Sequence, residues 1–138
     1  MKNINMKAQE AFQKAQKKFL FKEVELEKAI EMPEVTILLC KGKIGSLIGK
    51  NGVIVAELSK ILENKVRIVE HSKKQKKIIL DLIGNVRLLG VNEIYSPAGQ
   101  ETKIIINSQD KNSLITNPAH LEQALTQLLR TKTTIEFK

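Results

Sequence analysis

The segment Lys41-Gly-Lys-Ile-Gly-Ser-Leu-Ile-Gly-Lys-Asn-Gly52 holds four of the seven glycines of this chain of 138 residues. A dense run of β-branched and aliphatic residues from Val35 to Cys40 precedes it and predicts a buried strand. From Val53 to Asn64, behind it, apolar residues recur with helical spacing. The segment is therefore a glycine-rich turn between a strand and a helix. Such turns often bind phosphate, because backbone N–H groups approach the anion and the helix N-terminus favours negative charge.

Three phosphate-binding motifs occur in this setting. A Walker loop needs four residues between its glycine and a Gly-Lys pair that precedes Ser or Thr, but Gly45 and Gly49 enclose three residues and Asn51 follows Lys50. A dinucleotide fingerprint needs G-x-G, which the segment lacks. The remaining motif is the GXXG loop of a KH domain, which clamps the backbone of a single-stranded nucleic acid. We assign it to Gly49-Lys50-Asn51-Gly52. The alternative is a glycine-rich turn that only caps a helix.

The elements around the loop predict the type II KH arrangement. This is an α+β fold in which a three-stranded sheet carries its helices on one face. The expected order is a helix over 5–21, strands over 24–30 and 35–40, a short helix over 44–48, the loop, a helix over 53–64 and a strand over 65–71.

The same order then recurs, which indicates an internal repeat. A helix is expected over 73–82, strands over 87–96 and 101–108 joined by a turn at 97–100, a helix around 121–129, and a strand over 132–137. One constant offset without a gap places Ile37 on Ile104, Leu58 on Leu125 and Ile68 on Ile135. We therefore expect two tandem type II KH domains, residues 1–72 and 73–138.

The second copy has a degenerate loop. At the same offset, GXXG is replaced by Thr116-Asn117-Pro118-Ala119, which contains no glycine. Asn117 suits the N-cap of a helix, and Pro118 suits its first position. Pro118 also removes a backbone N–H, and Cβ atoms replace the open glycine surface. We therefore expect this loop to bind phosphate weakly and the second domain to serve mainly in packing.

The first copy resembles a known family. The stretch Cys40–Gly52, together with Val66-Arg-Ile-Val-Glu70, is similar to the first KH domain of the NusA transcription factors, and the tandem layout resembles their short, archaeal-type form. The resemblance implies binding of single-stranded RNA and a role in transcription elongation, termination or antitermination. RNA polymerase or other transcription factors would be further partners. Both KH domains of that family usually keep GXXG, so the second loop departs from it.

Carried onto this sequence, the resemblance and the loop motif predict one nucleic-acid site. The loop glycines would admit the RNA backbone, the two residues between them would face phosphates, apolar neighbours would form a floor for bases, and two lysines would guide the RNA electrostatically. The loop glycines are Gly49 and Gly52, and the residues facing phosphates are Lys50 and Asn51. The floor consists of Ile48, Val53 and Ile54, and the guiding lysines are Lys41 and Lys43.

Composition agrees with a non-catalytic nucleic-acid binder. The net charge is +8, which suits a polyanionic partner, and the low aromatic content of 4% disfavours recognition by rows of stacked rings. One cysteine, two distant histidines and scattered carboxylates form no recognisable catalytic or metal-binding motif, so we expect neither an enzyme nor a cofactor. We expect a cytoplasmic protein, since the sequence lacks a signal peptide and an apolar run long enough for a membrane span.

Two rival functions stay open at this point. KH domains also occur in ribosome assembly and RNA decay, so the same RNA chemistry could serve either process. The other rival function is that of a scaffold that binds mainly to RNA polymerase.

Overall fold

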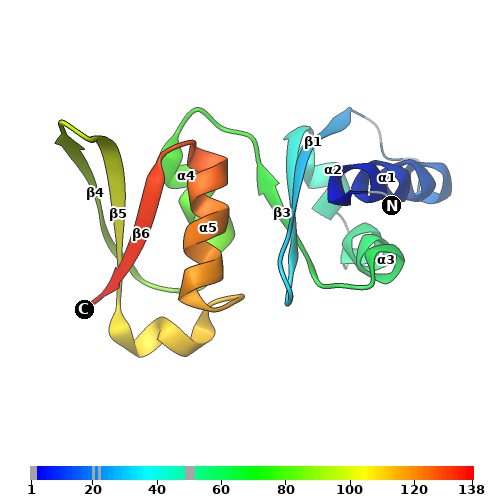
Figure 1. The fold of residues 1–138 in the computed structure, drawn as a ribbon. Coiled ribbons are helices and arrows are strands. Elements are labelled where there is room, and N and C mark those ends of the chain that lie inside the picture. Colours follow the sequence, from blue (N-terminus) through cyan, green and yellow to red (C-terminus); the bar gives the residue numbers. More distant parts are fainter. Residues whose placement is uncertain (1–2, 20, 22, 49–51) are drawn as a thin grey trace. The chain divides into compact units, whose positions relative to one another are not determined.

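The computed structural model describes residues 3–19, 21, 23–48 and 52–138. The chain divides into two compact units, Met1–His71 and Ser72–Lys138. Each is an α+β unit, and together the described residues form two three-stranded sheets, each with its helices on one face (Figure 1). None of the described helices is both long enough and apolar enough to span a membrane.

The first unit has the predicted order of elements. They are α1 (Ile4–Phe19), β1 (Val24–Glu31), β2 (Thr36–Gly42), α2 (Ile44–Ile48), α3 (Val53–Leu62) and β3 (Val66–Glu70). In the sheet, β2 lies between β1, which is antiparallel to it, and β3, which is parallel. A parallel pair needs a crossover connection, and α2, α3 and the loop between them supply it.

Helix α1 closes the core of the first unit. Its buried face consists largely of small side chains, Ala8, Ala11 and Ala15, which allow close packing, together with Phe12. The Phe12 ring meets Phe21 edge to face, with 5.2 Å between the ring centroids.

Two side-chain hydrogen bonds fix α1 along β1. The Ala29 N–H donates to Asn5 Oδ1 at 2.8 Å, and Gln9 Nε2 donates to the Leu26 carbonyl at 3.1 Å. They flank the β-bulge between Leu26 and Lys28, where backbone groups leave the regular ladder.

The second unit repeats this topology with two local differences. Its elements are α4 (Gln75–Ile83), β4 (Leu88–Ser96), β5 (Gly99–Ile106), the 3₁₀ helix η2 (Ser108–Ser113), α5 (Pro118–Leu129) and β6 (Lys132–Phe137), with sheet order β4-β5-β6. The first is the turn between the antiparallel strands, which spans 97–98 in the second unit and 32–35 in the first. It is also shorter than the predicted turn at 97–100, because Ser96 already pairs with Gly99. The second difference is that η2 takes the place of α2.

The ungapped repeat is correct for the last helix and strand but wrong by one residue for the middle strand. Leu38 pairs with Ile68 in the first sheet, and Ile104 pairs with Ile135 in the second. Ile104 is thus the counterpart of Leu38, not of Ile37. Successive strand residues face opposite sides of a sheet, so the slip matters. The second unit has one extra residue between β5 and α5, in the region of η2.

Candidate nucleic-acid interface

The predicted GXXG loop lies between α2 and α3. Gly49, Lys50 and Asn51 lie outside the described residues, so their predicted phosphate contacts stay predictions. The described flanks are Ile48, the last residue of α2, and Gly52, which precedes the first residue of α3. Both helices rest on the sheet of the first unit, since Ile44, Leu47 and Leu58 are in its buried core. The loop ends are therefore held by packed elements.

Gly52 leaves the N-terminus of α3 open. Its backbone is left-handed, with φ 61° and ψ 28°, which glycine adopts without the usual strain. It is the N-cap residue, and among the described residues no side-chain hydrogen bond caps the helix there. The first-turn N–H groups of a helix have no intrahelical partner and carry partial positive charge. An anion arriving along the loop would meet these donors.

Of the predicted apolar floor, the side chain of Ile48 lies outside the described part of the chain, and the other two side chains differ from each other. Val53, at the first position of α3, is 46% exposed. Ile54 is half-buried and packs against the core of the first unit. Val53 is therefore available to a base, whereas Ile54 is largely engaged in the fold.

Two glycines before the loop have different roles. Gly42 has φ 111°, and a Cβ there would lie 2.0 Å from the Glu23 carbonyl oxygen, so the fold itself requires glycine. Gly45, in α2, is exposed, and a Cβ there would meet nothing within 4 Å. Its φ lies outside the range that strains other residues. Within its own unit, nothing in the surroundings of Gly45 explains why a helix carries a glycine, which costs about 1 kcal/mol relative to alanine.

The two predicted guide lysines are both exposed. Lys41 belongs to the exposed end of β2. Lys43 follows that strand, and its Nζ lies 2.6 Å from Glu23 Oε2. Both side chains of this pair are well exposed, at 75% and 63%, and such pairs typically contribute about 0–1 kcal/mol. Lys43 can therefore exchange Glu23 for a phosphate at low cost.

The degenerate loop of the second unit forms the capped helix start that its sequence predicts. Asn117 is the N-cap of α5, and its Oδ1 accepts a hydrogen bond from the His120 N–H at 2.9 Å. Pro118 is the first helical residue. The helices α3 and α5 end at equivalent C-caps, Glu63 and Arg130, but α5 begins two residues earlier than its counterpart. The last two loop positions have thus become the first turn of a helix.

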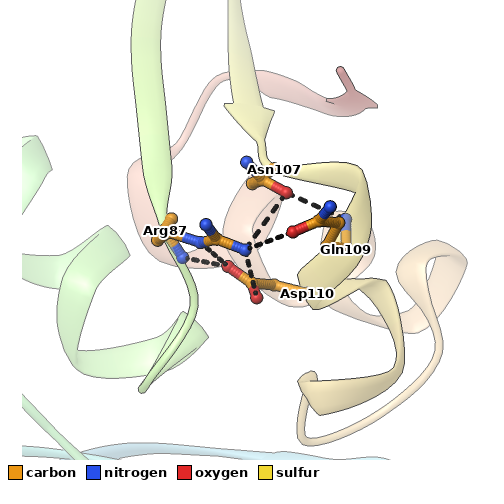
Figure 2. Close-up of polar contacts among 4 residues, drawn as sticks. All are labelled: Arg87, Asn107, Gln109 and Asp110. Carbon is orange, nitrogen blue, oxygen red and sulfur yellow. Dashed lines mark hydrogen bonds and ion pairs between the residues drawn. The ribbon is translucent and has the colours of Figure 1, made fainter.

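A polar cluster that the sequence analysis missed holds η2 in place (Figure 2). The Arg87 N–H donates to Asp110 Oδ2 at 2.8 Å, and Arg87 Nε donates to the same oxygen at 3.0 Å. The second guanidinium nitrogen, Nη2, also donates to Gln109 Oε1 at 3.1 Å and to Asn107 Oδ1 at 3.4 Å. The bonds from Arg87 hold the pKa of the Asp110 carboxyl below its ordinary value. No spacing rule in the sequence signals this cluster.

The cluster changes the charge beside the second loop. When the register that matches β2 with β5 is continued past the ends of the strands, Asn107 and Gln109 occupy the positions of Lys41 and Lys43. The Asp110 carboxylate also neutralises the charge of Arg87. The two positions that carry lysines in the first unit are therefore polar and uncharged in the second.

Other reactive groups are few in the described part of the chain. Burial raises the pKa of the Cys40 thiol to about 12, so it is neutral at pH 7. Among residues 3–19, 21, 23–48 and 52–138, no group of three or more His, Cys, Asp or Glu side chains is arranged to hold a metal ion.

Comparisons with known proteins identify the fold and nothing beyond it. No known protein family and no curated protein matches the chain. A solved structure described as "Crystal structure of APE1850" is similar, with a TM-score of 0.68 and 19% sequence identity. The similarity covers 93% of this chain and 96% of the other. At this identity it shows that the two chains share a fold.

Proposed function

We propose that the chain is a non-catalytic, single-stranded RNA-binding protein built from two tandem type II KH domains, of which the first binds the RNA. One observation carries the proposal. The sequence Gly49-Lys50-Asn51-Gly52 joins a short packed helix to a helix whose N-terminus is open and begins at a left-handed glycine. The mixed sheet supports the same assignment, since its order and strand directions suit the type II arrangement.

The proposed binding mode follows from the flanks of the loop. Phosphates pass over the loop and the first turn of α3, where backbone N–H groups and Lys50 neutralise them. Bases lie toward the exposed side chain of Val53. Lys41 and Lys43 attract the RNA strand electrostatically before it contacts the loop. A groove of this kind accepts splayed bases on one strand and excludes a duplex.

The resemblance to NusA proteins suggests the process in which the RNA is bound. We propose a NusA-like role in transcription elongation, termination or antitermination, in the cytoplasm, with RNA polymerase as a second partner. Ribosome assembly or RNA decay is the alternative with the same RNA chemistry. Purification from the native cells, followed by identification of the bound RNA and proteins, separates these roles, because a scaffold would carry polymerase without RNA bound at its own loop.

Fluorescence anisotropy with labelled single-stranded and duplex RNA tests the binding mode. Single-stranded RNA should bind more tightly. A single-strand contact contributes a slope of about −0.7 to log K against log salt, so a few contacts give roughly −2 to −3. Equal affinity for duplex RNA, or no dependence on salt, would refute the proposed groove.

A double substitution in the loop tests the site. Lys50→Asp with Asn51→Asp places two negative charges against the phosphates and leaves the core unchanged. RNA affinity should fall at least tenfold, about 1.4 kcal/mol. The melting temperature should stay nearly constant, since surface substitutions usually change stability by about 0.5 kcal/mol or less. Unchanged RNA affinity in this variant would show that the site lies elsewhere.

A further inference from the structure

The edge strand of the second unit is less covered than its counterpart in the first and carries exposed apolar side chains. No residue of β4 is buried, and Leu89 and Ile94 are 52% and 41% exposed. In the first unit, Val24, Leu26 and Ala29 of β1 lie in the core beneath α1. By register, Leu88 and Val91 of β4 are the counterparts of Leu26 and Ala29, yet both are only half-buried. The helix over this strand is also shorter, since α1 has 16 residues and α4 has 9.

The uncovered region forms a groove within the second unit. Its walls are Lys76 and Leu80 of α4 and residues 88–91 of β4, and its volume is about 550 Å³. Leu80 and Leu89 are both large, apolar and more than two-fifths exposed. A β-bulge between Leu88 and Gly90 takes Leu89 out of the ladder. The groove therefore presents aliphatic surface to an outside ligand.

We propose that this groove binds an extended, acidic segment of a partner protein that inserts an aliphatic or aromatic side chain between Leu80 and Leu89. Two further features define the occupant. Among the described residues β4 pairs with β5 alone, so its other edge offers backbone donors and acceptors to an added strand. Lys76 lines the groove, and Lys73 and Lys74 are exposed just before α4, so acidic flanking residues are favoured by charge.

A protein segment fits the groove better than RNA does. The walls offer no aromatic ring for base stacking, which is the main apolar contact of single-stranded nucleic acids. The lysines lie on and before α4, whereas β4 contributes Glu93 as its charged residue. A nucleic-acid track would need positive charge along its length. The groove therefore favours a protein segment over a single-stranded nucleic acid.

Selection of short random peptides displayed on phage against the full chain, with excess single-stranded RNA present, tests the proposal. Enriched peptides should combine acidic residues with a large apolar one. Leu89→Asp should weaken their binding at least about tenfold, as truncation of a central anchor does. Ile94→Asp, on the same strand and similarly exposed but outside the groove, should change it less than about twofold. Lys76→Glu should shift the selection away from acidic peptides.

Two further measurements make the result decisive. In the wild-type chain, bound peptide should shift the NMR amide signals of β4 and leave those of α3 unchanged. RNA affinity should stay within about twofold in the Leu89→Asp variant. Failure to enrich peptides, enrichment of basic peptides, or equal binding by Leu89→Asp would overturn the proposal. Loss of RNA affinity in Leu89→Asp would assign the groove to RNA and overturn it too.

Discussion

Gly45→Ala separates the demands of the fold from those of the ligand. A Cβ at this position meets nothing within 4 Å and requires no unusual backbone angle, so the fold should accept alanine. Gly-to-Ala in a helix interior is worth up to about 1 kcal/mol. Because α2 has five residues and Gly45 is its second, we expect about 0.5 kcal/mol of stabilisation. For a unit of this size that raises the melting temperature by roughly 2–4 °C.

RNA affinity should change in the opposite direction. Because nothing within the unit explains Gly45, we infer that the RNA backbone passes closely over α2. An added methyl group must then displace it, and overpacking typically costs about 1–3 kcal/mol. We therefore expect Gly45→Ala to weaken binding of labelled single-stranded RNA by roughly tenfold, measured by anisotropy, while thermal unfolding shows a more stable protein.

Two controls bracket this result. Ser46→Ala, at the neighbouring exposed position of α2, should leave RNA affinity nearly unchanged. Gly42→Ala should strongly destabilise the protein, because its Cβ would lie 2.0 Å from the Glu23 carbonyl oxygen. A stabilised Gly45→Ala protein with undiminished RNA binding would refute the inferred close approach. In that case the double variant Lys50→Asp with Asn51→Asp would still test whether RNA binds at the loop.

Two further predictions concern the second unit. The double variant Asn117→Asp with Ala119→Asp should lower RNA affinity less than about threefold in the anisotropy assay, because this loop is a capped helix start. A loss equal to that of the first-loop variant would show that the second loop also binds RNA. Asp110 should contribute stability above its unfolded pKa, near 4, and lose it as the pH falls through its lower folded pKa. The Asp110→Asn variant should therefore be less stable than the parent at neutral pH, as measured by denaturant titration. Its free energy of unfolding should also fall less steeply as the pH is lowered. The same fall toward acid pH in both proteins would contradict the role of the Arg87 contact.

Much of the fold could be predicted from periodicity. The short helix Ile44–Ile48 and the closing strand Lys132–Phe137 match the sequence prediction, and so does the capped start of α5 at Asn117. These features depend on neighbours within a few residues, through apolar spacing or the chemistry of one cap. Local rules of that kind can be read directly from a sequence.

Register and long-range polar contacts could not be predicted in the same way. The one-residue slip between β2 and β5 is invisible in an aliphatic run, because Ile37, Leu38 and Leu39 suit either face equally well. The contact of Gly42 with Glu23 joins residues far apart in the sequence. Arg87 and Asp110 are likewise separated, and either residue alone reads as an ordinary surface charge.

The two units show how one topology supports different surfaces. In the first, a left-handed glycine leaves the helix donors open, and lysines stand on the approach. In the second, Asn117 satisfies one first-turn donor, Pro118 removes another, and Asp110 cancels the nearby Arg87 charge. Each change lowers attraction for phosphate. The second unit also has the shorter first helix and an apolar groove between α4 and β4. These differences are the basis of the proposed division of labour, with RNA at the first unit and a protein segment at the second.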